Sequence, residues 1–393
     1  MTLVLPLLIL FLAGCTSAPP KLDTAPLASS VDQLLHSAVE KKQVPGAVAI
    51  VANSTSIFYE GAAAMDKSAI VAIASMTKPI TSAAVMQLVE SGKIKLDDPA
   101  SHYAPELADL QVLENGKLRP PKSPVTVRHL LAHTAGFGYE FMNQQIAAHV
   151  KAGKTPSIMA GGDGFLKAPL LFDPGTRWEY GINTDWLGRI VEKVSGKNLA
   201  EYFHEHIFQP LGMHDSFFVV PEDKKARLAA IHQRTPDGGF EPGKMALPPA
   251  TTFFSGGGGL FSTALDYTRF CQAILSGKYI LKPQTVDSMG ENQIADQIIT
   301  PFRSLVPQFA TDGAELPGSL DKFGLGFALN SNAIEGGRGR NTMAWAGIFN
   351  TFFWIDRERK TIGILLTQMS PGLDPGPNQL LEDFDRAVYS WRK

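Results

Sequence analysis

The chain has few cysteines, little net charge and no long apolar run. Its 393 residues include 2 cysteines and carry a formal net charge of −2. Such a small net charge gives no electrostatic basis for binding nucleic acid or an anionic lipid surface. With 44% hydrophobic and 19% charged residues, the composition is that of an ordinary globular protein. The length allows a full core, or two lobes that share one interface.

Two common catalytic patterns are also missing. No Gly-x-Ser-x-Gly occurs, and Ser255, the nearest approach to it, follows Phe254. This argues against the strand-to-helix elbow of α/β-hydrolases. His204-Glu-His206, with His214 nearby, has no zincin spacing. We therefore expect neither a metal nor a cofactor.

The longest apolar run lies at the N-terminus and reads as a targeting segment. Residues 3–12 are apolar, which is too short to span a bilayer but suits a signal-peptide core. Leu12-Ala-Gly-Cys15 resembles a bacterial lipobox, in which the cysteine is lipidated, although no Lys or Arg precedes the run. We predict an exported, membrane-anchored lipoprotein on the periplasmic face. The alternative is an N-terminal extension without this role.

The second cysteine, Cys271, is alone once Cys15 is acylated, so no disulfide forms within the chain. Cys271 lies in a segment with the pattern of an amphipathic helix, which predicts a buried structural thiol.

The remaining chain predicts two lobes. After a signal and linker region at 1–26, residues 27–80 and 285–393 carry a helix and a β-hairpin at 46–60, then strands expected at 323–329, 342–348, 351–355 and 361–368, and a final helix at about 378–391. Residues 81–284 read mainly as helices separated by Pro/Gly loops, and one of these helices, 199–208, is expected to end before Pro210. We expect an α/β lobe built from both ends of the chain, an antiparallel sheet flanked by helices, and a second, helical lobe between them.

The most informative segment is Ser75-Met-Thr-Lys78. It follows the apolar run 70–74 and precedes a predicted amphipathic helix at 80–91, so both side chains lie on one face about one turn apart. A lysine amine has an ordinary pKa of about 10.4, so it needs burial before it can act as a base for a hydroxyl. Backbone N–H groups at a helix start can hold a developing oxyanion. The same spacing at Ser319 and Ser390 lies in a loop and at the C-terminus, where we expect exposed serines.

Further motifs follow in a fixed order and carry a family resemblance. They are His133-Thr-Ala-Gly136, Trp178-Glu-Tyr-Gly-Ile-Asn183, Ser255-Gly-Gly-Gly-Gly-Leu-Phe-Ser262 and Trp345-Ala-Gly347. With Ser75-Met-Thr-Lys78, this set resembles the serine β-lactamase-related superfamily over roughly residues 28–390. That superfamily includes class C β-lactamases, DD-peptidases and family VIII carboxylesterases. The segment from Tyr180 to Gly188 most resembles the family VIII esterases.

The resemblance implies a role for each matching position. Ser75 would be the acylated nucleophile, and Lys78 and Tyr180 would share the general-base work. The backbone N–H groups of Ser75 and Ile348 would form the oxyanion hole. Residues expected to contact substrate are Asn183, Trp345, Gly347 and Phe137, although Phe137, like Tyr139, Phe253 and Phe254, could also be a core residue. His133 is expected to shape its loop rather than to join a triad, and the glycines at 256–259 to let backbone pass near the cleft floor.

Two departures from class C β-lactamases favour esters over lactams. The asparagine follows the tyrosine by three residues, at Asn183, rather than by two. Trp345 stands where those enzymes carry a lysine that helps to bind the β-lactam carboxylate. Arg338 or Arg340 could supply a charge, but we expect solvated turn residues there. The sequence therefore predicts a carboxylesterase acting on small-molecule esters of short to medium acyl chain. The alternatives are a β-lactamase or D-amino-acid peptidase, and a penicillin-binding-like cell-wall module with little turnover.

Overall fold

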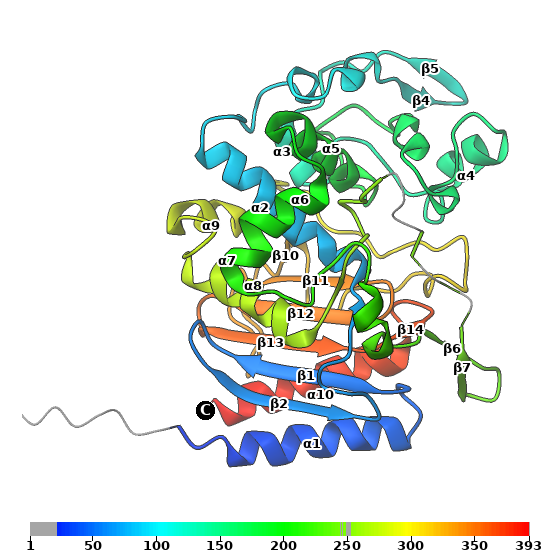
Figure 1. Ribbon diagram of the computed structural model, residues 1–393. Helices are drawn as coiled ribbons and strands as arrows, with labels where there is room; N and C mark the ends of the chain where they lie inside the picture. The colour runs from blue at the N-terminus through cyan, green and yellow to red at the C-terminus, as the bar shows by residue number, and fades with distance from the viewer. Residues whose placement is uncertain (1–21, 244, 246, 249–252, 393) are drawn as a thin grey trace, which may run out of the picture.

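The computed structural model describes residues 22–243, 245, 247–248 and 253–392. Its main sheet has seven strands in the order β2-β1-β13-β12-β11-β10-β9, and every neighbouring pair is antiparallel (Figure 1). The strands are β1 Ala47–Ala52, β2 Ile57–Ala63, β9 Lys322–Phe323, β10 Ala328–Leu329, β11 Met343–Gly347, β12 Thr351–Asp356 and β13 Thr361–Leu366. Because β1 pairs with β13, the sheet needs both ends of the chain.

Helices cover both faces of this sheet. The side chains of β1, β12 and β13 are all buried, as expected for strands covered on two sides. Trp354 contacts Phe384 of α10 (Pro375–Trp391), whereas its neighbour Phe353 contacts Tyr267 of α8 (Ala264–Ser276). Successive strand residues point to opposite faces, so α10 and α8 lie on opposite sides of the sheet. Helix α1 (Ala25–Glu40) packs beside α10. The predicted antiparallel sheet flanked by helices is confirmed.

The central helix of the second lobe is buried on all sides, although the sequence predicts an amphipathic helix. Helix α2 (Thr77–Glu90) packs against α5 (Asn183–Ser195) in the centre of the molecule, and residues 77–86 are buried on all sides. The prediction of an amphipathic helix is therefore wrong, because neighbouring elements enclose every face of the helix.

The shorter helices are α3 Val127–Leu131, α4 Gln144–Lys151, α6 Leu199–Phe203, α7 Gln209–Leu211 and α9 Pro283–Met289. The remaining strands form small sheets: β3 Val71–Ala72 with β8 Phe261–Ser262, β4 Val112–Glu114 with β5 Lys117–Arg119, and β6 His232–Arg234 with β7 Phe240–Pro242 and β14 Met369–Ser370.

Three predicted boundaries need correction. Helix α8 lies within the segment 81–284 assigned to the helical lobe, yet it packs on β1, β12 and β13 and belongs with the sheet. The strand expected at 323–329 is a tight hairpin, because Gly326 takes a φ of 92° and the Gly324 N–H bonds to the Phe327 carbonyl at 2.8 Å. The helix expected to end before Pro210 continues through a π-helical turn, His204–Phe208, into α7, which includes Pro210 and ends at Leu211.

A buried ion pair lies under the sheet. Nε of Arg338 is 2.9 Å from Asp385 Oδ2, and the guanidinium lies 4.5 Å from the centroid of the Trp354 ring. The Arg338 side chain is 2% exposed, so the prediction of a solvated turn residue is wrong for it; Arg340 is exposed. Burial raises the pKa of Asp385, and the opposing influence of Arg338 does not cancel this. Removing only one partner of this pair therefore lowers the free energy of unfolding, because the other charge stays buried without compensation.

Removing one partner of this pair tests its contribution to stability. We expect Asp385→Ala to lower the free energy of unfolding by about 3 kcal/mol, because Arg338 is left buried without its counter-charge. Urea denaturation measures this change. The matched control is Arg386→Ala, which removes an exposed partner of Asp383 and should cost less than about 1 kcal/mol. Equal losses in the two variants would contradict the role assigned to the buried pair.

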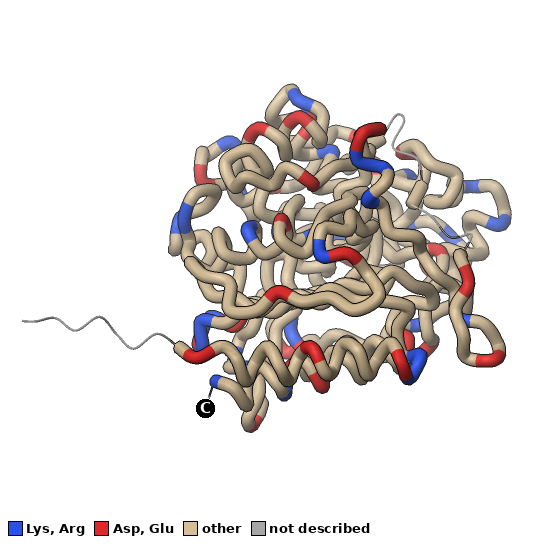
Figure 2. Tube along the Cα trace, turned by 60° about the horizontal axis from the view of Figure 1, so that its bottom comes forward, with Lys and Arg blue, Asp and Glu red and all other residues tan. Residues whose placement is uncertain are grey.

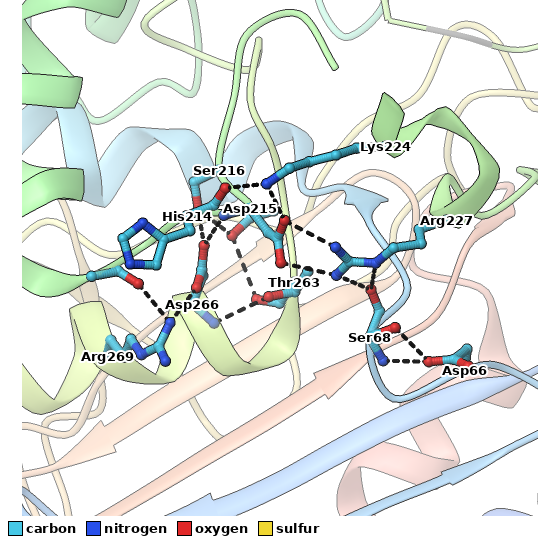
Figure 3. A network of polar contacts seen from close by, with 12 residues as sticks. Asp66, Ser68, His214, Asp215, Ser216, Lys224, Arg227, Thr263, Asp266 and Arg269 are labelled. Atoms are coloured by element: carbon cyan, nitrogen blue, oxygen red, sulfur yellow. Dashed lines mark hydrogen bonds and ion pairs between the residues drawn. The ribbon is translucent and has the colours of Figure 1, made fainter. Parts of the chain in front are cut away.

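A second polar network ties the start of α8 to two loops (Figure 3). The buried Asp266 carboxylate accepts the Asp215 N–H at 2.7 Å and the Ser216 hydroxyl at 3.1 Å. Arg227 joins Asp215 at 2.9 Å to the Ser68 carbonyl at 2.6 Å. These contacts anchor the 214–227 segment to the sheet lobe.

Charged positions of both signs are mixed along the chain. In the view of Figure 2, Asp and Glu positions are interspersed with Lys and Arg positions on the Cα trace, and neither sign gathers in one region. In the described part of the chain, no helix has the length and apolar character needed to cross a bilayer.

Candidate active site

Ser75 lies on a sharp turn between strand β3 and helix α2. The turn is a 3₁₀ segment, Ala74–Met76, and Ala74 takes a φ of 43°, which is uncommon for a residue with a Cβ. Ser75 is only partly buried, whereas the residues on either side of it are buried. The turn therefore exposes one hydroxyl at the start of α2. The serines of the two other matching segments, Ser319 and Ser390, are exposed as expected.

The predicted nucleophile and its two predicted partners come together. The Tyr180 hydroxyl donates to Ser75 Oγ at 2.7 Å, and Lys78 Nζ donates to the same oxygen at 3.2 Å. Lys78 Nζ also lies 4.7 Å from the centroid of the Tyr180 ring. One hydroxyl thus has an amine and a phenol within hydrogen-bond reach, which is the arrangement needed to remove its proton.

Lys78 is held by two further groups. Lys78 is 1% exposed, and its amine donates to the Tyr139 hydroxyl at 3.0 Å and to the Gly257 carbonyl at 2.7 Å. Burial raises the pKa of Tyr139 well above its usual value, so this phenol is neutral. Since a carbonyl only accepts, Lys78 is the donor in the bond to Gly257. These two bonds, with the bond to Ser75, define the direction of the amine as well as its place.

The end of strand β11 approaches the Ser75 turn from the sheet side. A Cβ at Gly347 would lie 2.4 Å from the Ile73 carbonyl oxygen and 2.3 Å from Thr351 Oγ1. Only glycine allows this approach. Ile348, the next residue, lines the same cavity as Ser75, and its backbone N–H has no hydrogen-bond partner among the described residues.

Filling the space at Gly347 should therefore disturb the site. We expect Gly347→Ala to lower kcat by about a hundred-fold, because the strand end must move away from Ser75, and to destabilise the fold by about 1–3 kcal/mol. Steady-state kinetics and thermal melting measure the two effects. The matched control is Gly258→Ala: Gly258 also lines the cavity, but its new Cβ would meet only the Ala74 carbonyl carbon, at 3.8 Å, so kcat should be retained even where KM changes. Similar losses in the two variants would exclude this explanation.

Ser75 opens into a large apolar cavity. The space amounts to about 160 Å³, roughly ten times what one water molecule requires. The described residues of its wall include no Asp, Glu, Lys, Arg or His. Its aromatic, Met and Leu/Ile side chains are Tyr139, Phe141, Met142, Ile158, Met159, Phe165, Tyr180, Met245, Leu247, Phe253, Phe302, Phe309, Leu316, Trp345, Ile348, Phe349 and Leu373. An uncharged, apolar ligand fits this wall.

Comparison with known proteins agrees with this geometry. The Beta-lactamase family model matches residues 31–386. The chain belongs to that family. It is 31% identical over 372 residues to a lovastatin esterase of Penicillium rubens, covering 85% of this chain and 91% of the relative.

Other relatives carry different activities on the same fold. The acyltransferase calJ of Penicillium decumbens is 31% identical over 351 residues, covering 85% of this chain and 82% of that one. The structure of simvastatin synthase (LovD) from Aspergillus terreus superposes with a TM-score of 0.80 at 25% identity, over 94% of this chain and 99% of that one. Esterases and acyltransferases are thus both represented among the family members similar to this chain.

Two predicted substrate contacts of this β-lactamase-family site are misplaced. Asn183 is fully buried, and its amide faces His133 Nδ1 at 2.9 Å instead of the cavity. Phe137 is also buried, with its ring 6.4 Å from Trp186, and it is not part of the cavity wall. The extra residue between Tyr180 and Asn183 places the asparagine inside the first turn of α5, which explains its direction. Trp345, Gly347 and Ile348 do line the cavity.

The remaining candidate side chains from the sequence make no hydrogen bond to Ser75 in the described structure. His133 is buried, which lowers its pKa well below the ordinary value, and it packs 5.3 Å from the Tyr180 ring. Cys271 is a free, buried thiol, as predicted. Among the described residues, no group of His, Cys, Asp and Glu could hold a metal ion. Cys15 lies outside the described residues.

Sequence reasoning missed both additional contacts of Lys78. Tyr139 was expected only as a pocket or core aromatic, and no spacing motif connects it with Lys78. The glycine run was expected to pass near the cleft floor, and Gly257, Gly258 and Gly259 do line the cavity. No pattern in the sequence predicted the hydrogen bond between the Gly257 carbonyl and Lys78.

Proposed function

We propose that this protein is a serine esterase that hydrolyses uncharged carboxylic esters with short to medium, apolar acyl groups. The supporting observation is the position of Ser75 Oγ, which contacts Lys78 and Tyr180 and opens into a cavity without charged side chains in its described wall. Membership of a family that includes esterases supports the same class of reaction.

The proposed reaction has two halves. In the first, Ser75 Oγ bonds to the ester carbonyl carbon, and the hydroxyl proton passes to the Lys78–Tyr180 pair. The bond to the alcohol oxygen then breaks, and the leaving alkoxide takes that proton. In the second half, water attacks the acyl-enzyme by the same route and releases the acid. The N–H groups of Ser75 and Ile348 would hold the oxyanion in both halves.

The described wall, which carries no charged side chain, favours an ester over a β-lactam. A β-lactam or a D-amino-acid peptide carries a carboxylate, and burying that charge without a partner costs several kcal/mol. Trp345 occupies the position at which the related β-lactamases carry a lysine, and it offers an apolar face 5.2 Å from the Tyr180 ring. An apolar acyl or alcohol group gains from the same surface.

Two chromogenic substrates separate the alternatives. We expect rapid hydrolysis of p-nitrophenyl butyrate and little of nitrocefin, and Ser75→Ala should abolish the ester activity. Strong nitrocefin turnover with negligible ester hydrolysis would instead indicate a β-lactamase or peptidase. A stable adduct on Ser75, seen by mass spectrometry without product release, would indicate a penicillin-binding-like module.

A second candidate is transfer of the acyl group to an alcohol. The aromatic and aliphatic wall can bind an apolar alcohol beside the acyl-enzyme and displace water, and one relative is named as an acyltransferase. Adding an alcohol to the ester assay tests this. Transfer predicts a new ester, detected by mass spectrometry, and a faster release of p-nitrophenol; hydrolysis alone gives only the free acid.

We further propose export and lipidation at Cys15, on the strength of the N-terminal sequence. Mass spectrometry of the mature protein from a bacterial host measures this. A diacylglycerol-modified N-terminal Cys15 would support the proposal, whereas an intact Met1 would contradict it.

A further inference from the structure

Asp185 is a buried carboxylate that the proposed reaction does not use. It lies in the first turn of α5, five residues after Tyr180, and it is completely buried. Its Oδ1 accepts two hydrogen bonds, from Ser255 Oγ at 2.6 Å and from the Gly257 N–H at 3.0 Å. A buried carboxylate is expensive unless it is well satisfied, so its position needs an explanation.

The carboxylate is connected to Lys78 through a single residue. Gly257 donates its N–H to Asp185, and its carbonyl accepts from Lys78 Nζ at 2.7 Å, the shortest of the hydrogen bonds of that amine. A Cβ at position 257 would lie 2.4 Å from Asp185 Oδ2, so the close contact requires glycine. Movement of the Gly257 backbone would therefore redirect Lys78.

Threonine side chains of α2 hold the same turn before and after Gly257. Thr81 Oγ1 donates to the Gly256 carbonyl at 2.7 Å, and Thr77 Oγ1 accepts from the Leu260 N–H at 3.1 Å. Among the described residues, Asp185 is the side chain that fixes the Gly257 N–H itself. The turn is thus fastened to α2 at its flanks and to α5 at the residue that contacts the amine.

We infer that Asp185 is a positioning residue that holds the Gly257 carbonyl against the amine of Lys78 and so keeps this amine directed at Ser75. The inference deepens the proposed function, since it assigns a support to the proposed base. It depends on the hydrogen bonds to Oδ1 rather than on charge. Oδ2 has no hydrogen-bond partner among the described residues, and a proton there would leave both bonds to Oδ1 intact. Burial raises the pKa of this carboxyl, although Lys78 and the two donors oppose the shift.

Two substitutions separate support from charge. Asp185→Ala removes both acceptors, and we expect kcat to fall about a hundred-fold with KM changed less than about three-fold, because a displacement of about 1 Å has an effect of this size. Asp185→Asn keeps an oxygen for both donors, and an NH₂ in place of Oδ2 breaks no existing bond. We therefore expect the asparagine variant to keep at least a third of the wild-type kcat.

Asp266→Ala is the matched control. Asp266 is also a buried carboxylate in the first turn of a helix, and it also accepts one backbone N–H and one serine hydroxyl, but it supports the 214–216 segment instead of the catalytic turn (Figure 3). Asp266 also pairs with Arg269 at 2.8 Å, so its loss should lower thermal stability at least as much as Asp185→Ala does, without the fall in kcat. If both alanine variants lose kcat equally, or if Asp185→Asn is as impaired as Asp185→Ala, the positioning role is overturned.

Two readouts do not need the natural substrate. A fluorophosphonate labels an activated serine, and its second-order rate constant should fall in Asp185→Ala as far as kcat does. A crystal structure of this variant should show Lys78 Nζ displaced from the Gly257 carbonyl; an unmoved Lys78 would overturn the inference. Failure of the wild-type protein to hydrolyse esters would count against the proposed function, whereas the position of Lys78 in the variant judges Asp185 independently.

Discussion

Ser75→Ala is expected to lower the turnover of p-nitrophenyl butyrate by at least about a thousand-fold. Removing the nucleophile of a serine hydrolase leaves only the contributions of binding and of the oxyanion site. Ser75 is partly exposed and stands at the cavity floor, so losing its hydroxyl removes no core packing. The melting temperature should therefore change by no more than a few degrees. Steady-state kinetics and calorimetry of the same preparation test both statements.

The other serines with a lysine three residues later provide the control. Ser319→Ala and Ser390→Ala change exposed hydroxyls, and each should leave kcat unchanged. Retention of ester hydrolysis by Ser75→Ala, in a preparation shown to be free of other esterases, would exclude the acyl-enzyme mechanism.

Tyr180→Phe is expected to have the next largest effect, a fall in kcat of about a hundred- to ten-thousand-fold with little change in KM. The substitution removes only the hydroxyl that donates to Ser75 Oγ at 2.7 Å, and a general acid–base group contributes on this scale. The ring should stay in place, because Trp345 and Phe302 pack against it at 5.2 and 5.3 Å. Single-turnover kinetics should show slower acylation of Ser75 and slower hydrolysis of the acyl-enzyme, because the proposed reaction uses the phenol in both halves.

Tyr139→Phe is the matched control for this second prediction. Its phenol also belongs to the site, but it contacts Lys78 Nζ at 3.0 Å and makes no hydrogen bond to Ser75. We expect a loss of about ten-fold, since one of several supports of the amine is removed. A larger loss for Tyr139→Phe than for Tyr180→Phe would contradict the role in proton transfer that we propose for Tyr180.

The fold was predictable where local patterns were strong. The hairpin of β1 and β2, the strands β11 to β13 and the helix α10 all match their expected segments within a few residues. The errors fall where burial or backbone geometry overrides the pattern. Helix α2 is enclosed on every face, and two glycines fold the expected strand at 323–329 into a hairpin. Helix α8 packs on a sheet whose strands come from distant parts of the chain, so its sequence could not place it.

The site was predictable in its reacting groups and less so in its surroundings. Ser75 and Lys78 are three residues apart, so one helical turn brings them together, and Tyr180 was identified from an ordered set of motifs. Asn183 and Phe137 were expected to contact substrate, but both are turned into the core. Their side chains are held by His133 and Trp186, and no local pattern reveals these contacts.

By itself, the sequence determined a serine–lysine turn, a composition able to form two packed lobes, and a resemblance to a known superfamily of serine hydrolases. Tertiary structure alone decided how the lysine is held. Its contacts with Tyr139 and Gly257 join residues 61 and 179 positions apart, and the phenol that reaches Ser75 comes from 105 positions away. Side chains so far apart in the chain meet only after the lobes pack, because the spacing of residues controls contacts only within a few turns of helix or strand.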